Sequence, residues 1–223
     1  MIRAEHRRWA RLVFNRYIDS LLRKHFTGFY QVNAFPPVPP QGGLLILPNH
    51  MSWWDGFFID YVCRHYLPHH PFYIMMLEKQ LQRYWFFKKL GAYSINPGQG
   101  RSVLETMKYT LDLLSDTSAV VMFPQGVLQP YSPDEYHFEK GGLRYLVSRN
   151  SHDFHILPVA FKIQYYEDRE PEIACRFGIV KEASMFREDL FPAVRDFDEN
   201  IKALERESLK RNYSNDLFDN NIS

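Results

Sequence analysis

Residues 44–56 read Leu44-Leu45-Ile46-Leu47-Pro48-Asn49-His50-Met51-Ser52-Trp53-Trp54-Asp55-Gly56, and their order indicates the kind of domain this chain forms. Four consecutive apolar residues between glycines and a proline are typical of a buried strand. Polar residues that directly follow such a strand lie at its carboxyl end, where sites form in α/β sheets. We expect Ser52 to cap a helix that begins there, with Asp55 in its first turn.

Short apolar runs and longer amphipathic stretches alternate along the rest of the chain. Helices are expected over residues 52–66, 77–89, 101–115 and 139–149, with a charged helix from about Arg195. Strands are expected over residues 44–47, 72–76, 118–123, 155–161 and 172–180. This alternation predicts an α/β fold, namely a layered αβα domain with a mostly parallel mixed sheet.

Composition changes divide the chain into four segments. Residues 1–30 hold a basic amphipathic helix that we expect to associate with a membrane, and residues 31–43 form a proline-rich connector. The main domain is expected over residues 44–211, followed by a flexible polar tail over residues 212–223. The proline run at 36–40 predicts a stiff, extended connection between the helix and the domain.

The N-terminal helix carries a charge that the rest of the chain does not share. The first 26 residues of the chain have a net charge of +5, and the remaining residues have a net charge of −4. Apolar residues recur at helical spacing between its basic residues: Val13, Phe14, Tyr17, Ile18, Leu21 and Leu22. This pattern fits an anchor on a membrane surface, and it also fits a helix packed on the domain with a solvated charged face. The charge asymmetry favours the membrane.

Bulk composition excludes some classes of protein. The chain has 223 residues, 45% of them hydrophobic, and a net charge of +1, so charge gives no case for a nucleic-acid partner. Two distant cysteines, Cys63 and Cys175, indicate reduced thiols. No run of 18 apolar residues and no signal-peptide core occur, which predicts a location on the cytoplasmic face of the membrane, peripheral or monotopic. The histidine clusters at 65–70 and 152–155 are interpreted as loop residues and not as metal ligands.

His50 and Asp55 are the candidate catalytic pair. A turn between them can bring the Asp55 carboxylate to one imidazole nitrogen and leave the other nitrogen basic. No serine lies in a G-x-S-x-G setting and neither cysteine is near a base, so His50 is expected to activate a substrate hydroxyl or water. A histidine at a strand end can also be purely structural, and the pair alone does not decide between the two interpretations.

Taken together, four blocks resemble the glycerolipid acyltransferases, the family that includes lysophosphatidic acid acyltransferase. The resemblance covers roughly residues 40–180. The blocks are Asn49-His50 with Asp55, then Gly91-Ala92-Tyr93-Ser94-Ile95, then Phe123-Pro124-Gln125-Gly126-Val127-Leu128 with Phe138-Glu139-Lys140-Gly141 after it, and finally Leu157-Pro158-Val159-Ala160.

The resemblance implies transfer of a fatty acyl group from a thioester, acyl-CoA or acyl carrier protein, to a hydroxyl of a lipid acceptor at a membrane. His50 would be the general base and Asp55 its partner, with no metal and no cofactor beyond the donor. The residues implied to bind substrate are Asn49, Ser52, Gly91, Arg101, Phe123, Pro124, Gln125, Gly126 and Val127.

Two positions depart from the family pattern. Gln125 stands where the family usually has glutamate, and Leu128 stands where arginine is common. The arginine expected near Pro97 is also displaced, and Arg101 is the nearest candidate. A neutral or zwitterionic lipid, or a lipid-linked sugar, therefore becomes a candidate acceptor. A catalytically inactive lipid-binding protein of the same fold and a thioester or ester hydrolase remain alternatives, and the oligomeric state stays open.

Overall fold

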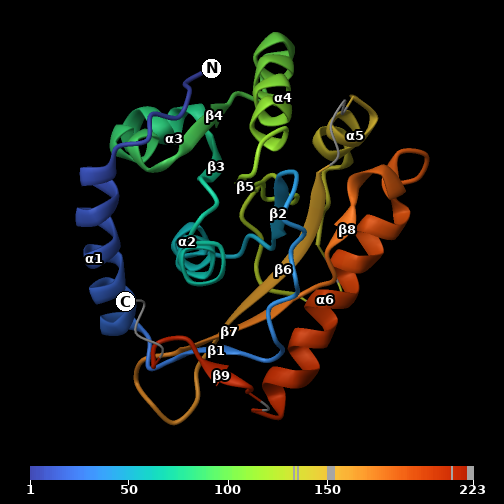
Figure 1. The fold of residues 1–223 in the computed structure, drawn as a ribbon. Coiled ribbons are helices and arrows are strands. Elements are labelled where there is room, and N and C mark those ends of the chain that lie inside the picture. Colours follow the sequence, from blue (N-terminus) through green and yellow to red (C-terminus); the bar gives the residue numbers. More distant parts are fainter. Residues whose placement is uncertain (133, 135, 150–153, 212, 220–223) are drawn as a thin grey trace.

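The computed structural model describes residues 1–132, 134, 136–149, 154–211 and 213–219. Within them, nine strands form one sheet in the order β4-β3-β5-β2-β6-β7-β1-β9, with β8 pairing with β6 (Figure 1). The strands are β1 (Phe29–Gln31), β2 (Leu44–Pro48), β3 (Phe72–Leu77), β4 (Ala92–Ile95), β5 (Ala119–Val121), β6 (His155–Gln164), β7 (Glu172–Phe177), β8 (Lys181–Glu182) and β9 (Asn215–Asp216).

Eight helical segments surround the sheet in the described part of the chain. They are α1 (Arg8–His25), α2 (Asp55–Tyr66), α3 (Glu78–Arg83), the 3-10 helix η1 (Trp85–Leu90), α4 (Gly100–Leu114), α5 (Lys140–Arg149), the 3-10 helix η2 (Ala183–Phe186) and α6 (Phe191–Leu209). The helix expected over 77–89 is divided into α3 and η1. Gly91 ends η1 with a φ of 105°, a left-handed conformation that glycine adopts without strain.

Parallel pairing dominates the half of the sheet that contains β2. Strand β2 pairs in parallel with both β5 and β6, and β3 pairs in parallel with β5 and β4. Beyond β6 the direction reverses, because β7 runs antiparallel to β6 with Val159 opposite Phe177. The predicted layered α/β fold with a mostly parallel mixed sheet is confirmed.

Side chains of β2 alternate between two cores, which explains why its apolar run is continuous. Leu44 and Ile46 join the core under α1 and α2, whereas Leu45 and Leu47 join the core under α4, α5 and α6. Figure 1 shows α1 and α6 on opposite sides of the sheet. A strand covered on both faces has no polar side, so periodicity of two is absent from its sequence.

Helix α1 is docked on the domain through one stripe of residues. Ala10, Phe14, Ile18 and Leu22 recur every four residues and are buried in the core shared with α2. Val13, which the sequence pattern assigns to the same apolar face, is exposed. Among the described residues, no helix has the length and apolar content needed to cross a bilayer.

Residues 213–219, part of the segment expected to form a polar tail, pack on the domain. Strand β9 pairs antiparallel with β1, which the sequence reading missed, and Leu217 and Phe218 are buried. Tyr61 donates a hydrogen bond to the Leu217 carbonyl at 3.2 Å. Two apolar residues within a polar segment are enough to fix it against α2. The rest of the expected tail, residues 212 and 220–223, lies outside the described residues.

Candidate active site

The carboxyl ends of β2 and β5 meet at one edge of the sheet and carry the central residues of the site. His50 follows β2, and residues 123–125 follow β5, the parallel neighbour of β2. The rings of His50 and Phe123 stack with centroids 4.2 Å apart. The structure therefore brings together the first and third blocks that the sequence singled out.

Asp55 is fully buried and its carboxylate is saturated with donors. Oδ2 lies 2.9 Å from His50 Nδ1 and accepts the backbone N–H groups of Met51 at 2.7 Å and Ser52 at 2.8 Å. The Ser52 hydroxyl donates to Oδ1 at 2.6 Å. Because both oxygens of the carboxylate accept hydrogen bonds from the surrounding turn, Asp55 is held in one orientation and in turn orients the imidazole.

The Ser52 prediction is partly wrong. Helix α2 begins at Asp55, three residues later than expected, and Trp54 occupies the N-cap position. Ser52 still accepts the Trp54 N–H at 3.1 Å, while Asp55 reaches back to the Ser52 N–H. These two reciprocal hydrogen bonds resemble a capping box. They place the Asp55 carboxylate against the turn that carries His50.

Every hydrogen-bonding group of His50 except Nε2 has a partner among the described residues. Its backbone N–H donates to the Gln125 side-chain oxygen at 2.5 Å, and its carbonyl accepts the Gln129 N–H at 2.9 Å. The side chain is 25% exposed, and no described residue hydrogen-bonds Nε2. Since Nδ1 donates to Asp55, Nε2 is the nitrogen that carries the lone pair and can accept a proton.

Asn49 supports the site from behind. Its amide N–H donates to the Phe161 carbonyl at 2.9 Å, and its amide oxygen accepts the Phe161 N–H at 2.7 Å. The side chain is buried, and both of its polar atoms are used by β6. Asn49 therefore fixes the end of β2, from which His50 projects, and does not present its amide to a ligand.

The loop after β5 forms the other wall of the site. Gln125 is buried, and Gly126 adopts a φ of 72°, with its N–H donating to the Phe123 carbonyl at 3.2 Å. The Pro124 carbonyl accepts the Glu139 N–H at 2.6 Å, which ties this loop to the start of α5. Val127 and Leu128 are exposed, so two apolar side chains stand at the rim beside His50.

Two expected site residues do not contact this constellation. A Cβ on Gly91 would lie 2.0 Å from the Phe72 carbonyl oxygen, so glycine is required there by close backbone packing. Arg101 is the second residue of α4, its side chain is 94% exposed, and it pairs with Glu105 at 3.5 Å. In the described part of the chain, neither residue has a hydrogen bond or ion pair with His50, Asp55 or Gln125.

The cysteines are not nucleophiles in this fold. Cys63 and Cys175 are buried in the core, and burial raises the pKa of both thiols far above neutral. Across residues that the structure describes, no group of three or more histidine, cysteine or carboxylate side chains could hold a metal ion. His152, part of one cluster considered above, lies outside the described residues.

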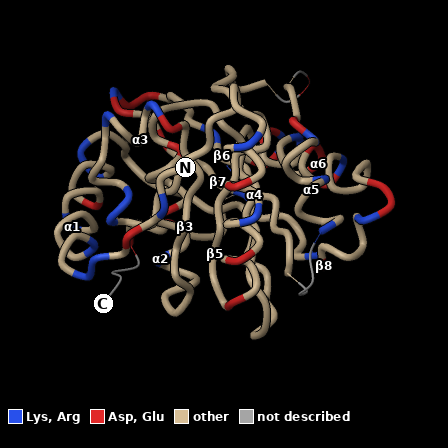
Figure 2. The backbone as a smooth tube through the Cα atoms, turned by 90° about the horizontal axis from the view of Figure 1, so that it is seen from above, with Lys and Arg blue, Asp and Glu red and all other residues tan. Residues whose placement is uncertain are grey.

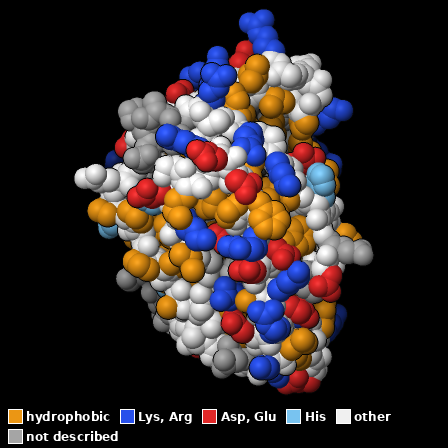
Figure 3. Space-filling view, turned by 90° about the vertical axis from the view of Figure 1, so that its right-hand side faces the viewer, with side chains coloured by type: hydrophobic (Ala, Val, Ile, Leu, Met, Phe, Trp, Pro, Cys, Tyr) orange, Lys and Arg blue, Asp and Glu red, His pale blue; other side chains and the backbone are white. Residues whose placement is uncertain are grey.

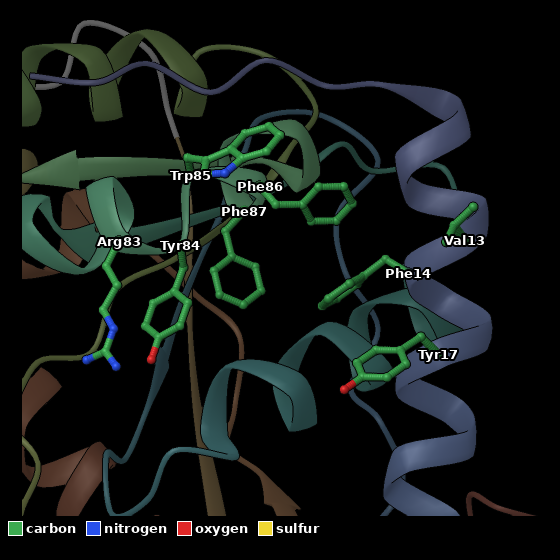
Figure 4. Close-up of a pocket in the computed structure, with 8 residues that line it drawn as sticks. All are labelled: Val13, Phe14, Tyr17, Arg83, Tyr84, Trp85, Phe86 and Phe87. Carbon is green, nitrogen blue, oxygen red and sulfur yellow. The ribbon is translucent and has the colours of Figure 1, made fainter.

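A cleft of about 450 Å³ lies between α1 and the segment 83–87, and sequence reasoning missed it (Figure 4). Its lining residues, mostly aromatic, are Val13, Phe14, Tyr17, Arg83, Tyr84, Trp85, Phe86 and Phe87. The Tyr84 ring lies 5.2 Å from the ring of Trp53, which is half exposed and follows His50 by three residues. The run of four aromatic residues at 84–87 is the feature of the sequence that could have indicated this cleft.

One comparison with known proteins identifies a family, and another identifies a similar fold. A family model described as Acyltransferase matches residues 30–162. The chain is similar in structure to the 1-acyl-sn-glycerophosphate (LPA) acyltransferase PlsC from Thermotoga maritima, with a TM-score of 0.58 and 15% sequence identity over 90% of this chain and 81% of that chain. At this identity the likeness concerns the fold. No curated protein sequence matches the chain.

Proposed function

Because this chain belongs to the Acyltransferase family, we propose that it transfers a fatty acyl group from a thioester to a hydroxyl of a lipid, with His50 as general base. The observation that carries this proposal is the 2.9 Å contact between His50 Nδ1 and the buried Asp55 carboxylate. It leaves Nε2, which no described residue hydrogen-bonds, as the nitrogen of the ring that can accept a proton. No protein nucleophile is needed, since the acceptor hydroxyl supplies the attacking oxygen.

In the proposed reaction, His50 Nε2 removes the hydroxyl proton while the acceptor oxygen bonds to the thioester carbonyl carbon. The tetrahedral intermediate then breaks its C–S bond, and the imidazolium returns the proton to the leaving thiolate. Asp55 stabilises the imidazolium between the two steps. General-base assistance of this kind contributes about 10²–10⁴-fold to the rate. The donor is acyl-CoA or acyl carrier protein, and the reaction needs no metal or further cofactor.

The Val127 N–H is the proposed donor to the oxyanion. The Gly126 N–H is already used by the Phe123 carbonyl, whereas among the described residues the Val127 N–H has no hydrogen-bond partner. Both groups lie in the loop whose Phe123 ring stacks on His50. A preorganised backbone donor costs no rearrangement as charge develops on the carbonyl oxygen.

The aromatic cleft is the proposed site for the acyl chain. Its volume of about 450 Å³ falls within the range of roughly 300–1,000 Å³ that is typical of small-molecule sites. Trp53 connects it to the His50 turn through its contact with Tyr84. Phe58, by contrast, is fully buried in the core and is not available to shelter the acyl chain.

The rim beside His50 favours an acceptor without a terminal phosphate. Val127 and Leu128 are apolar and exposed there, and Arg101 is directed into solvent with Glu105. A phosphate without a guanidinium partner loses hydrogen bonds of about 1.5–3 kcal/mol each. We therefore assign the acceptor to neutral or zwitterionic lipids with a free hydroxyl, including lipid-linked sugars.

Leu128→Arg tests this assignment of the acceptor. The substitution is expected to lower KM for lysophosphatidate by about tenfold or more, because one charge-assisted hydrogen bond contributes about 1.5–3 kcal/mol. Leu128→Gln, which adds polarity without charge, serves as the matched control and should leave that KM within about twofold. Wild-type protein that already prefers lysophosphatidate to neutral acceptors would contradict the assignment.

The reaction itself is tested by offering a labelled long-chain thioester and a panel of lipid acceptors to the purified chain. The panel contains lysophosphatidate, lysophospholipids, and neutral and sugar-bearing lipids, with products identified by mass spectrometry. Acylated neutral or zwitterionic lipid is the expected product. Free fatty acid released at the same rate without any acceptor would instead identify a hydrolase, since water can also reach a histidine that is 25% exposed.

The inactive lipid-binding alternative is disfavoured by the way Gln125 is used. Its amide oxygen accepts the His50 N–H, a role that does not depend on a carboxylate charge. His50 and Asp55 are both present and in contact. Both contacts hold His50 in the orientation that general-base catalysis requires, and an inactive lipid-binding protein would not need them. Absence of any product from folded protein that still binds lipid would restore this alternative.

A further inference from the structure

Gln129 joins two parts of the chain at the candidate active site. Its backbone N–H donates to the His50 carbonyl at 2.9 Å, and its side-chain oxygen accepts the backbone N–H of His137 at 2.8 Å. No motif in the sequence assigns a role to Gln129, which directly follows the block Phe123–Leu128. Because the second bond uses the backbone of His137, it does not depend on the imidazole of that residue.

The proposed oxyanion donor lies two residues before Gln129. Val127 is 60% exposed, so side-chain packing does not fix this stretch of the loop. The stretch is held instead at its two ends. At one end the Gly126 N–H is bonded within its own loop at 3.2 Å, and at the other end Gln129 is bonded to His50. The position of the Val127 N–H relative to His50 therefore depends on Gln129.

The segment that carries His137 is anchored on α6. The Tyr136 hydroxyl donates to Asp198 of this helix at 2.9 Å. The rings of Tyr136 and Phe138 each lie 5.4 Å from the ring of Phe197, which is buried on α6. Figure 2 shows α6 beside α5, on the side of the molecule opposite α1. Since His137 lies between two anchored residues, its N–H is held in place.

The Asp198 carboxylate is a fixed anchor because both of its oxygens are bonded. Oδ1 accepts the Tyr136 hydroxyl, and Oδ2 accepts the Lys202 ammonium at 3.1 Å. Burial and the bond to Asp198 raise the pKa of Tyr136, which therefore stays a proton donor at neutral pH. Figure 3 shows Lys and Arg interspersed with Asp and Glu on the α6 side. A surface of mixed charge does not mark a site for a ligand of one charge, so we assign these residues to holding the segment that carries His137.

We propose that Gln129 is a positioning residue for acyl transfer, because it sets the distance between His50 and the Val127 N–H. The base removes the hydroxyl proton in the step in which the carbonyl oxygen gains its charge, so both groups must fit one tetrahedral intermediate. A displacement of about 1 Å between such groups costs up to about 10²-fold in rate. Gln129 acts through these two groups, and no contact between Gln129 and the substrate is required. The inference rests on the proposed function for the reaction and for the role of Val127.

Substitutions at Gln129 test this role through steady-state transfer from the labelled thioester. Gln129→Ala removes the side-chain oxygen and is expected to lower kcat by about 10- to 100-fold, with both KM values within about twofold of wild type. Gln129→Asn keeps the amide on a side chain that is one methylene shorter, and it should lose as much. Gln129→Glu keeps an acceptor oxygen at the same reach and should restore kcat to within about threefold of wild type.

The matched control is Asn33→Ala. The Asn33 amide also bonds backbone groups, since it donates to the Phe177 carbonyl at 2.8 Å and accepts the Phe177 N–H at 3.0 Å. Strands β6 and β7 lie between Asn33, which follows β1, and the His50 turn. Asn33→Ala should lower the midpoint of urea unfolding at least as much as Gln129→Ala does, and it should leave kcat within about twofold of wild type.

Amide hydrogen exchange, followed by mass spectrometry, tests the contacts without any substrate. In Gln129→Ala, exchange should rise by about tenfold or more at residue 129 and at His137, while α2 keeps its protection.

Unchanged exchange at these two positions would overturn the inference, as would a kcat for Gln129→Ala within about twofold of wild type. A loss of kcat that Asn33→Ala matches, or that Gln129→Glu does not restore, would also overturn it. A folded wild-type chain without transfer activity would contradict the proposed function, and the positioning role with it. Failure of the inference alone requires an active wild type.

Discussion

Replacing His50 with alanine is expected to lower kcat/KM for acyl transfer by about 10³-fold, the middle of the range for loss of a general base. The reason lies in the geometry, since Nε2 is the free nitrogen of a ring whose other nitrogen is held by Asp55 at 2.9 Å. No other histidine is placed at the junction of β2 and β5 in the described residues. Steady-state transfer from a labelled thioester to the preferred acceptor measures the effect.

The matched control for His50→Ala is His137→Ala. His137 lies near the same loop, is largely exposed and contacts Glu139 at 2.7 Å, but it makes no contact with His50 or Asp55. Its removal should change kcat/KM by no more than about twofold. Circular dichroism and a thermal melt establish that both variants are folded. A His50→Ala variant that keeps more than a tenth of wild-type activity would show that the base is elsewhere.

The sequence was sufficient for the parts of the structure that depend on local patterns. The continuous run at 44–47 predicts a strand covered on both faces, and β2 is that strand. Its end carries His50, and the parallel neighbour β5 supplies the Phe123 block, as an α/β sheet requires. The contact between His50 and Asp55 follows from a spacing of five residues across a single turn.

Features that depend on contacts between distant segments could not be predicted from local sequence patterns. Periodicity groups Val13 with Phe14 on α1, but only the position of α2 and η1 decides which of them is buried. The cleft joins residues about seventy positions apart, and no local pattern reports that distance. Burial of Leu217 depends on the β1 edge and on Tyr61, which supply partners that a polar tail does not suggest by itself.

Alanine at Asp60 is expected to destabilise the fold by about 3 kcal/mol, the largest effect on stability that we predict for a single substitution. Asp60 is buried in α2 and accepts hydrogen bonds from Arg11 of α1 and from Arg64, the latter at 3.1 Å. Arg64 also donates to Asp19 of α1 at 2.6 Å. Burial lowers the pKa of Arg64, but its bonds to Asp19 and the charge of Asp60 outweigh this and raise the pKa above its ordinary value.

Removal of the Asp60 carboxylate takes away the ion-pair partner of the Arg11 guanidinium and leaves Arg64 with Asp19 alone. Both guanidinium groups are mostly buried, which is why the cost exceeds that of a surface pair. Urea unfolding measures it, and Glu105→Ala, which breaks the exposed pair with Arg101, should cost no more than about 0.5 kcal/mol. Amide exchange should rise first in α1, because α1 loses its charged attachment to α2. Equal costs for the two variants would mean that the buried network does not hold α1.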